Sequence, residues 1–591
     1  MARKPLQPRH KLLADEHGTL HKAWAGRIRV ALVYPNGYAV GMSNLGFQTV
    51  YRLVNALDEV VCERAFLPET AGPQAPFPLT LESGQPLGAF DVVAFSVSFE
   101  NDYPNILTLL QTAGLPLRSR DRGPSHPLVM AGGVACFLNP EPLAPFIDLF
   151  MLGEAEEMLP AFFGAFDPAA DRRELLMRLA RTQPGLYVPA GYHPSYHADG
   201  SLQAFTPVAD VPPRVRRVFL PDLAATATCS TVVTPHTTFA RTYLIETGRG
   251  CPHGCRFCSA GYIYRPPRFR PLALLEENLR QGAALTDRIG LVGAAVSDLP
   301  EIGALCSGLD GAEVRISFSS LRADALTPEL IAVLQQSRVK TATIAPDAGS
   351  ERMRRVINKG IDEASILAAA ETLVAAGIPN LKLYFMVGLP SETSEDVAAI
   401  VALCKRIKHH FLTSSRSRGR IGELTVSLNS FVPKPATPFQ WVAMDEVKTL
   451  KAKIRQVTAG LKKVPNVRVH ADVPRWAFLQ ALLSRGDRRV AQLLEAAAAN
   501  GWNWPQTFKG SVLNPGFYVT RERPLTEVLP WDFIDHGVRK VFLKKEYQLA
   551  LAASTSPDCP MNGTCSRCGA CSGPAATASG PGPGQDPWSP P

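Results

Sequence analysis

Short apolar runs alternate with segments of helical periodicity between residues 26 and 166. Each run has the length and near-continuous apolar character of a parallel strand that is covered on both faces. The five runs are residues 27–34, 59–64, 90–97, 127–131 and 147–152. This pattern predicts an α/β, doubly wound, Rossmann-like domain. Such a sheet places its ligand crevice at the carboxyl ends of the strands.

A second series of apolar runs begins at Arg241 and again alternates with helical segments. Its six runs are residues 241–247, 289–293, 313–318, 341–346, 380–387 and 423–430. They predict a partial (β/α)6 barrel of the TIM type. Apolar residues at every second position face the helices, so the alternate positions point into the barrel. We expect Lys382, Tyr384, Arg315 and Asn429 on that inner wall, which predicts an interior that holds water or a polar ligand.

The length of 591 residues is too great for one compact core, and composition shifts suggest the boundaries. The predicted parts are a polar N-terminal tail (1–25), the doubly wound domain (26–166), a connector (167–236), the barrel (237–463), a mainly helical extension (464–555), a Cys-rich segment (556–571) and a disordered tail (572–591). We expect the run Arg416, Arg418 and Arg420 to be a mobile insert.

Charge and hydrophobicity exclude some classes of protein. Lys and Arg number 62 against 53 Asp and Glu, and this modest excess does not indicate an obligate nucleic-acid binder. No apolar run reaches the length of about 18 residues that a membrane span requires. We therefore expect a cytoplasmic protein with no membrane partner.

Three cysteines follow the first barrel strand, at the end where such barrels place their active sites. Cys251, Cys255 and Cys258 are spaced to hold three irons of a cubane cluster, which leaves the fourth iron without a protein ligand. The alternative is a zinc site in which His253 completes a Cys₃His set.

The spacing of these cysteines, with Phe257 as the aromatic residue before the last of them, resembles the cluster loop of the radical S-adenosylmethionine (SAM) superfamily. The resemblance implies a [4Fe-4S] cluster whose fourth iron binds SAM. It also implies that one electron cleaves SAM to methionine and a 5′-deoxyadenosyl radical, which takes hydrogen from a substrate. The cofactors then carry the chemistry and the protein supplies orientation. An external electron donor of flavodoxin or ferredoxin type is implied as a partner.

Two segments resemble parts of that superfamily's SAM site. Ser297 and Asp298 follow the second barrel strand, where relatives often carry a Gly-Gly-Glu run that contacts the methionine amino group. Asp347 and Ser350 lie in a turn after the fourth strand that is similar to the ribose-contacting turn. The resemblance therefore implies cofactor contacts at these four residues.

Two further segments are similar to the adenine side of the SAM site. Gly388 and Glu392 follow the fifth strand, and the alternative there is an ordinary turn before a helix. Val432 follows the sixth strand and resembles the final adenine contact. Each match is weak by itself, but they recur at successive strand ends.

Over residues 25–571 the sequence resembles bacterial proteins that join a cobalamin-binding-like domain to a radical SAM barrel. The resemblance is carried by residues 34–46, 131–136, 152–156 and 430–435. It implies cobalamin-assisted methyl transfer as one outcome, and it assigns no substrate. Cobalamin domains that supply a lower axial ligand carry Asp-x-His-x-x-Gly after the first strand, whereas no histidine occurs between His21 and His126. Either cobalamin binds without a protein imidazole, or the domain has kept its fold and lost the cofactor.

Four more cysteines lie near the C-terminal end of the sequence. The set Cys559, Cys565, Cys568 and Cys571 supplies enough thiolates to complete a second iron–sulfur cluster or to hold tetrahedral zinc. Auxiliary clusters in several superfamily members favour iron. Two other hypotheses for the function of the protein stay open at this point. It could be an RNA-modifying enzyme similar to the methylthiotransferases, or a non-enzymatic iron–sulfur carrier or sensor.

Overall fold

The structure is a computed structural model, which describes residues 9–68, 77–208, 210–308, 314–319, 321–415 and 422–571. The predicted disordered tail, 572–591, and the run Arg416, Arg418 and Arg420 lie outside the described residues. None of the described helices is long and apolar enough to cross a lipid bilayer.

The N-terminal part of the chain forms a six-stranded sheet of order β2-β1-β3-β4-β5-β6. Its strands are β1 (Ile28–Tyr34), β2 (Val60–Phe66), β3 (Val92–Ser96), β4 (Leu128–Gly132), β5 (Leu149–Met151) and β6 (Leu186–Tyr187). The five predicted strands are confirmed and are parallel, while β6 adds an antiparallel edge. With only two residues, β6 is too short for its periodicity to predict it.

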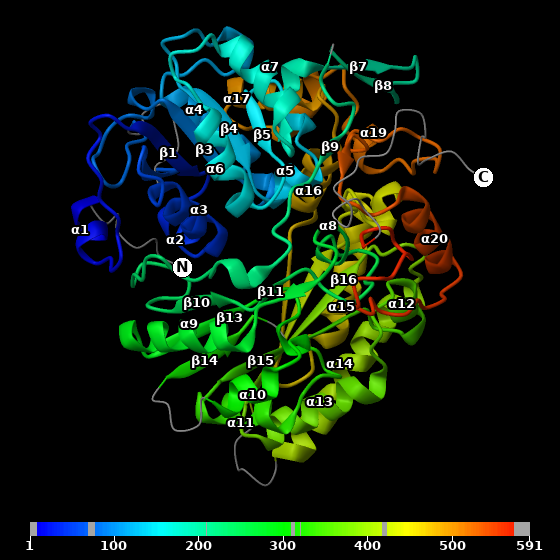
Figure 1. Ribbon diagram of the computed structural model, residues 1–591. Coiled ribbons are helices and arrows are strands. Elements are labelled where there is room, and N and C mark those ends of the chain that lie inside the picture. Colours follow the sequence, from blue (N-terminus) through cyan, green and yellow to red (C-terminus); the bar gives the residue numbers. More distant parts are fainter. Residues whose placement is uncertain are drawn as a thin grey trace.

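Helices connect these strands, and the sheet lies above the barrel in the view of Figure 1. They are α2 (Tyr38–Gly41), α3 (Leu45–Asn55), α4 (Tyr103–Thr112), α5 (Val134–Leu138), α6 (Ala155–Ala165) and α7 (Arg172–Thr182). The side chain of Asn44 caps α3 by accepting a hydrogen bond from the Phe47 N–H. Helices α3 and α6 contact each other, so both cover the same face of the sheet.

The described part of the predicted N-terminal tail, residues 9–25, packs against this sheet instead of lying free. It contains helix α1 (Arg9–Ala14). The Arg64 side chain on β2 is fully buried and pairs with Glu16 at 2.6 Å and with Glu82 at 2.7 Å. A buried guanidinium requires carboxylate partners, and Glu16 supplies one of them from the segment predicted to be a tail.

The barrel strands form two neighbouring sheets, β10-β13-β14 and β15-β16-β17-β18. Their bounds are β10 (Tyr243–Glu246), β13 (Arg288–Val292), β14 (Arg315–Phe318), β15 (Thr341–Asp347), β16 (Asn380–Val387), β17 (Leu424–Ser430) and β18 (Val467–Ala471). A parallel bridge between Leu321 and Ile344 joins the sheets. All six predicted strands are present, and β18 extends the barrel by a seventh. Its exposed Arg468 and His470 make β18 a weakly apolar edge strand, so the sequence pattern did not reveal it.

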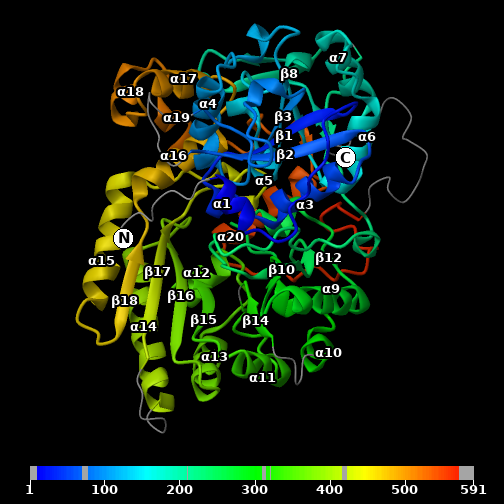
Figure 2. The same cartoon turned by 90° about the vertical axis from the view of Figure 1, so that its left-hand side faces the viewer.

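Helices lie on the outer side of these strands (Figure 2). They are α9 (Leu272–Leu285), α10 (Ile302–Ser307), α11 (Pro328–Gln336), α12 (Glu351–Val356), α13 (Glu363–Ala375), α14 (Ser394–Ser415) and α15 (Val447–Leu461).

The predicted alternation along the strands holds in β16, where Leu381, Leu383 and Phe385 are fully buried. Lys382 lies on the opposite face, with its ammonium 4.8 Å from the centre of the Tyr384 ring. Arg315, the first residue of β14, differs from the prediction because its exposed guanidinium pairs with Asp287, which directly precedes β13. The polar inner face is therefore strongest in the second sheet.

Two further segments contact the N-terminal domain: the chain between the two domains, and the chain that follows the barrel. Residues 186–216 contain the hairpin β7 (Tyr192–Tyr196) and β8 (Leu202–Pro207), followed by β9 (Val215–Arg216). After the barrel come α16 (Pro474–Arg485), α17 (Val490–Ala499), α18 (Trp504–Gly510), α19 (Pro515–Val519), β19 (Ile534–Asp535) and α20 (Lys540–Leu551). Strand β19 pairs with β9, and α17 packs on α4, so the C-terminal extension returns to the N-terminal domain.

Candidate functional site

The loop after β10 brings three cysteines together beneath the N-terminal domain. Burial raises the pKa of Cys251 to about 12 and that of Cys255 to about 11, and the neighbouring thiols add to both shifts. Burial also raises the pKa of Cys258. Thiols whose pKa is raised this far ionise to thiolates near neutral pH only when a cation or a metal cluster stabilises the negative charge.

Two glycines allow the loop to curl tightly. Gly250 has a φ of +83°, and a Cβ there would lie 2.7 Å from the Tyr264 carbonyl oxygen. A Cβ on Gly254 would lie 2.8 Å from the Asn358 amide nitrogen. The positive φ and the close backbone carbonyl therefore require glycine at position 250, whereas a side chain at position 254 would require the Asn358 amide to shift.

Backbone N–H groups lie near two of the sulfur atoms. The His253 N–H lowers the pKa of Cys251, and the Ala260 and Gly261 N–H groups at the start of α8 (Ala260–Ile263) lower that of Cys258, in each case against the larger effect of burial. Three converging thiols with N–H donors around them form a donor set that fits an iron–sulfur cluster.

His253 is not placed to complete a zinc site. Its Nε2 lies 2.7 Å from an Asp298 carboxylate oxygen, and its Nδ1 lies 2.8 Å from Asp558. Burial opposes the charge of this imidazole, but the two carboxylates outweigh burial and raise its pKa to about 9. With both ring nitrogens occupied by carboxylates, the Cys₃His alternative does not fit the structure.

Asp298 carries an unsatisfied oxygen close to the cysteine loop. It lies with Ser297 in the 3₁₀ turn Val296–Asp298 after β13. The Oδ1 atom contacts His253, whereas Oδ2 is buried and has no hydrogen-bond partner. Because the Asp298 charge also acts on Cys251, this free acceptor lies within electrostatic reach of the loop. A buried unpaired carboxylate oxygen fits the amino group of a bound ligand.

Asp347 ends β15 with a φ of +61° and forms an ion pair with Lys359 at 2.6 Å. Burial lowers the pKa of Lys359, but the charges of Asp347 and Cys255 outweigh burial and raise it. Arg322 also acts electrostatically on Cys255. Neither Lys359 nor Arg322 is predictable from sequence, since neither lies in a motif or at a periodic position.

The remaining predicted residues make contacts toward the outer helices. Ser350 caps α12, and its hydroxyl donates a 2.6 Å hydrogen bond to Asp396 on α14. Glu392 accepts a 2.7 Å hydrogen bond from the Gly388 N–H and pairs with Lys453 on α15 at 2.8 Å. Val432 and Phe257 are half-buried and pack on the core.

The four C-terminal cysteines also lie together. Burial raises the pKa of Cys571, and the thiols of Cys568, Cys559 and Cys565 add to that shift. The Cys559 N–H donates a 2.8 Å hydrogen bond to the carbonyl of Pro252, so this group abuts the first cysteine loop. Within the described ranges, no three His, Cys, Asp or Glu side chains are closed around the position of a single metal ion.

Arg265 connects the two groups of cysteines. Its guanidinium is 3% exposed and lies beside Cys568, and its Nη2 atom has no hydrogen-bond partner. The residue follows helix α8 and its C-cap Tyr264, and its Nε donates a 2.5 Å hydrogen bond to the Gly261 carbonyl. A buried cation with a free donor fits an anionic thiolate centre.

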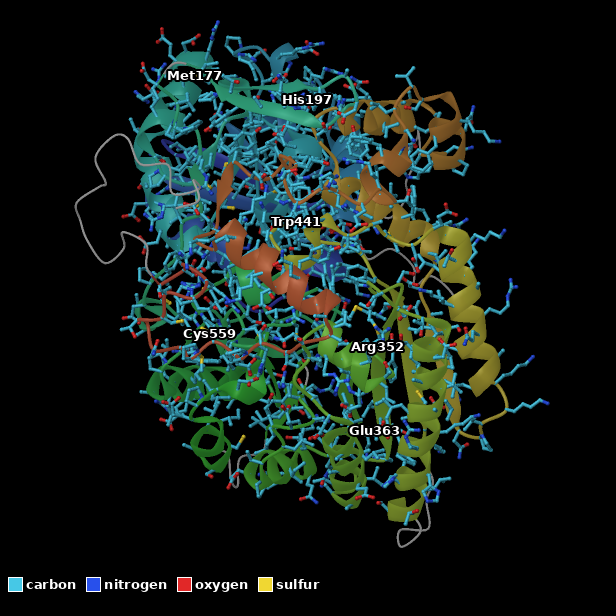
Figure 3. All side chains as sticks on the ribbon, turned by 90° about the vertical axis from the view of Figure 1, so that its right-hand side faces the viewer. Met177, His197, Arg352, Glu363, Trp441 and Cys559 are labelled. Carbon is cyan, nitrogen blue, oxygen red and sulfur yellow. The ribbon has the colours of Figure 1, made fainter. Side chains whose placement is uncertain are left out.

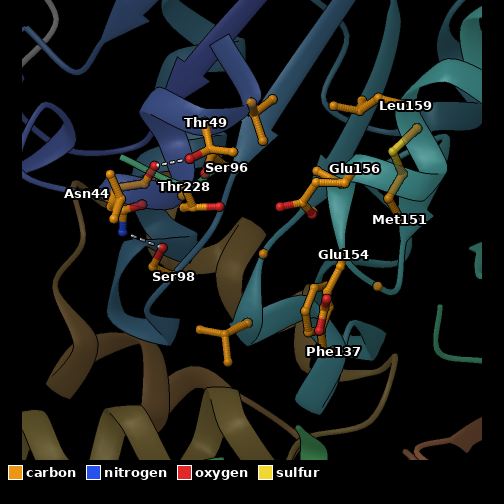
Figure 4. Close-up of a pocket in the computed structure, with 18 of the residues that line it drawn as sticks. Asn44, Thr49, Ser96, Ser98, Phe137, Met151, Glu154, Glu156, Leu159 and Thr228 are labelled. Carbon is orange, nitrogen blue, oxygen red and sulfur yellow. Dashed lines mark hydrogen bonds between the residues drawn. The ribbon is translucent and has the colours of Figure 1, made fainter. Parts of the chain in front are cut away.

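A cavity of about 510 Å³ lies between the N-terminal sheet and the first cysteine loop. Its inner end is apolar, with Val30 and Leu32 from β1, Val50 from α3 and Leu159 and Phe163 from α6. Figure 4 shows Asn44 and Ser98, joined by a 3.0 Å hydrogen bond, across the cavity from the side that carries Glu154 and Glu156. The opposite wall belongs to the barrel, including residues 248–250, Ala260 and Tyr264.

Glu154 and Glu156 tie the N-terminal domain to the cysteine loop. Arg249 lies two residues before Cys251 and contacts Glu154 at 2.7 Å and Glu156 at 2.5 Å. Burial opposes ionisation of Glu154, but hydrogen bonds from Arg268 and the charge of Arg249 hold its pKa at about 2. A ligand in the cavity therefore contacts both the sheet edge and the loop.

Two family models match this chain: "Radical SAM proteins, N-terminal" over residues 46–189 and "Radical SAM superfamily" over residues 245–404. A relative from Methanocaldococcus jannaschii, "Uncharacterized protein MJ0966", is 30% identical over 472 residues, which cover 79% of this chain and 90% of that protein. The chain belongs to the radical SAM superfamily. It is an enzyme whose cofactors are a [4Fe-4S] cluster and SAM, and it requires an electron donor.

Other similarities are more distant. The tRNA-2-methylthio-N(6)-dimethylallyladenosine synthase of Sorangium cellulosum is 26% identical over 196 residues, covering 28% of this chain and 39% of that enzyme. The structure of the radical SAM methyltransferase TsrM from Kitasatospora setae, with cobalamin and a [4Fe-4S] cluster bound, matches with a TM-score of 0.47 and 13% identity. That match covers 80% of this chain and all of the other.

Proposed function

We propose that Cys251, Cys255 and Cys258 hold the SAM-cleaving cluster and that SAM binds between it and the carboxyl ends of the barrel strands. When bound, the cluster supplies the electron that splits SAM into methionine and a 5′-deoxyadenosyl radical. The role of the chain is to hold the thiolates, to orient SAM and to exclude water. Burial of Cys255 and the N–H donors around Cys258 support this role.

In this proposal Asp298 accepts a hydrogen bond from the methionine amino group through its free Oδ2 atom. Lys359 and Arg322 place positive charge beside Cys255, where it balances the thiolates and the SAM carboxylate. Asp347 then shares its carboxylate between Lys359 and the ribose hydroxyls. The other assignments made from sequence are retained: Ser297 beside Asp298 at the methionine amino group, Ser350 in the ribose turn, and Gly388, Glu392 and Val432 on the adenine side. Phe257, before the last cysteine of the loop, is retained as a cofactor contact.

The N-terminal cavity is proposed to bind cobalamin, which would carry a methyl group for transfer to the substrate. The observation that carries this proposal is the shared cavity, with walls from both the sheet edge and the cysteine loop. Its apolar inner end, between the sheet and helices α3 and α6, suits the aromatic tail of a corrinoid. The described lining contains no histidine, so binding would proceed without a protein imidazole on the cobalt.

We further propose that Cys559, Cys565, Cys568 and Cys571 hold a second iron–sulfur cluster. Zinc is the alternative that the sequence leaves open for these four thiols, and metal analysis decides between the two. The external donor is proposed to be a flavodoxin or a ferredoxin.

SAM cleavage is tested with anaerobically reconstituted protein and dithionite. We expect 5′-deoxyadenosine from the wild-type protein and none from Cys255→Ala, because the cluster would lose one of its three ligands. Cys404→Ala is the matched control, since Cys404 is a buried thiol on α14. Equal yields from the Cys255 and Cys404 variants would refute the assignment.

Cobalamin binding is tested separately, by adding hydroxocobalamin and recording visible spectra after gel filtration. We expect a retained corrinoid band, and S-adenosylhomocysteine alongside 5′-deoxyadenosine once a substrate is supplied. Loss of the band on gel filtration would mean that the domain keeps the fold without the cofactor.

A further inference from the structure

Helix α20 and the segment that follows it form one continuous surface beside the first cysteine loop. We call residues 539–571 the tail face. Figure 3 views it directly, with the orange-red helix α20 close to the labelled Cys559. The tail face carries exposed residues on its outer side and contacts the loop that carries Cys251 through the Cys559 backbone.

The outward charge of the tail face is positive. Its sequence contains five cations, Arg539, Lys540, Lys544, Lys545 and Arg567, and two acids, Glu546 and Asp558.

Both acids have partners within the protein, although the Asp558 side chain is 55% exposed. Glu546 is 4% exposed and pairs with Arg256 at 3.1 Å, and Asp558 contacts His253 at 2.8 Å. Arg539 and Arg567 donate hydrogen bonds to backbone carbonyls of the segment and keep their charge. Lys540 is paired with Asp532, and Lys545 is exposed. Carboxylates therefore accompany Lys540 and the Cys559 end of the face, whereas Lys544 and Lys545 form no ion pair with the residues that the structure describes, and the five cations outnumber the two acids.

Exposed apolar side chains lie among these cations. Val541 is 61% exposed, Leu551 is 56% exposed and Met561 is 43% exposed. Apolar contacts inside a ring of charge are typical of transient protein–protein interfaces, in which charge guides the encounter and apolar contact holds the pair briefly.

The tail face lies in direct contact with the loop that would receive an electron. The Cys559 N–H bonds to the carbonyl of Pro252, the residue after Cys251. Ser556 and Asn358 exchange hydrogen bonds of 2.8 Å and 3.3 Å, and the Asn358 amide also donates to the Gly254 carbonyl. A carrier docked on the tail face is thus separated from the first loop by a single layer of chain.

We propose that the tail face is the docking surface for a small acidic one-electron carrier, either an iron–sulfur or a flavin protein. The reduced carrier loses one electron on this face and the cluster of the first loop gains it, with no other group consumed. This inference rests on the proposed function of that loop. It holds for either metal at the second group of cysteines, because docking depends on the surface charges.

The test reverses the charge of two lysines that take no part in holding the cysteines. The double variant Lys544→Glu/Lys545→Glu is compared with Lys448→Glu/Lys451→Glu on α15, where both lysines are exposed and the change in charge is the same. The probe is a reduced flavodoxin added to the holoenzyme. The measurements are its Kd by calorimetry at low and high salt, and the rate of cluster reduction by stopped-flow absorbance.

We expect the α20 variant to bind the flavodoxin at least tenfold more weakly at low salt and to reduce its cluster correspondingly more slowly. The α15 variant should match the wild type. Equal binding by the α20 variant and the wild type, or equal weakening in both variants, would overturn the proposal. Dithionite-driven formation of 5′-deoxyadenosine should stay unchanged in the α20 variant, and its loss from the wild-type protein would count against the proposed function alone.

Discussion

The pair Lys359 and Asp347 illustrates how a single buried charge shapes the site. The two side chains are 2.6 Å apart, at 9% and 8% exposure, and Lys359 also acts on Cys255. An ion pair in such a place costs desolvation, and it contributes little net stability to the fold. Its value lies in keeping a positive charge next to the thiolates.

Removing one partner of this pair should lower the free energy of unfolding strongly, whereas removing both should lower it much less. We expect Lys359→Gln to lower the free energy of unfolding by about 3–5 kcal/mol, because Asp347 is left buried and unpaired. The double variant Asp347→Asn/Lys359→Gln should recover most of that loss. Urea unfolding of the cluster-free proteins measures both changes. Equal losses in the single and double variants would show that the charge is not the cause.

The shifted pKa of Glu154 makes the free energy of unfolding depend on pH in a predictable direction. Its pKa falls from 4.5 to about 2 in the folded protein, where Arg268 and Arg249 outweigh the effect of burial. A carboxyl with a depressed folded pKa contributes stability that is present above pH 4.5 and lost as pH falls toward 2, on the order of 3 kcal/mol in total. The difference in unfolding free energy between wild type and Glu154→Gln should therefore shrink across this range. Glu157→Gln, at an exposed position on α6, should show no such change.

At the scale of the elements, the loops at the carboxyl ends of β3 and β4 line the part of the cavity that we call its mouth, around Ser98 and Gly133. Gly133 has a φ of +108°, and a Cβ there would lie 2.4 Å from the Val97 carbonyl oxygen. The two loops touch backbone to backbone only because this residue is glycine. The mouth therefore depends on one residue without a side chain.

Gly133→Ala should separate these loops and weaken corrinoid binding without affecting the barrel. We expect loss of the retained corrinoid band and unchanged iron content, with destabilisation of about 1–3 kcal/mol. Gly164→Ala on α6 is the control, since a Cβ there meets nothing within 4 Å, and it should be neutral or slightly stabilising. Corrinoid retention by Gly133→Ala at the wild-type level would contradict this role of the mouth.

Strands and cysteine spacing were predictable because each has a local signature. The buried strands of both domains read as continuous or alternating apolar runs, and the loop from Cys251 to Cys258 is contiguous in sequence. The packing of residues 9–25 was not predictable, because Glu16 is buried only by pairing with Arg64 from another element. Lys359, Arg322 and Arg265 were missed for the same reason: tertiary contacts alone place them beside the cysteines.

At the scale of the whole molecule, the N-terminal domain and the C-terminal segment both contact the first cysteine loop. The N-terminal domain reaches the cysteine loop through Glu154 and Arg249, and the C-terminal segment reaches it through Cys559 and Pro252. The barrel contributes the loop itself. The site is thus assembled from three parts that are distant in sequence.

Truncation after Leu551 should weaken iron binding at the first loop, because it removes the hydrogen bonds of Ser556 and Cys559 to Asn358 and Pro252. We expect a severalfold faster loss of iron to a chelator and a broadened electron paramagnetic resonance signal from the remaining cluster. Truncation after Cys571 is the control and should behave as the full chain. Identical iron loss from both truncations would show that the segment does not support the loop.

The hydrogen bond between Cys559 and Pro252 also bears on how the protein matures. During translation, the cysteine loop emerges from the ribosome about three hundred residues before the segment that covers it. During synthesis, Cys251 and its neighbours therefore lack one wall of their surroundings. Iron delivered at that stage would meet a loop without this wall, so we expect more lasting insertion once the segment around Cys559 has been synthesised.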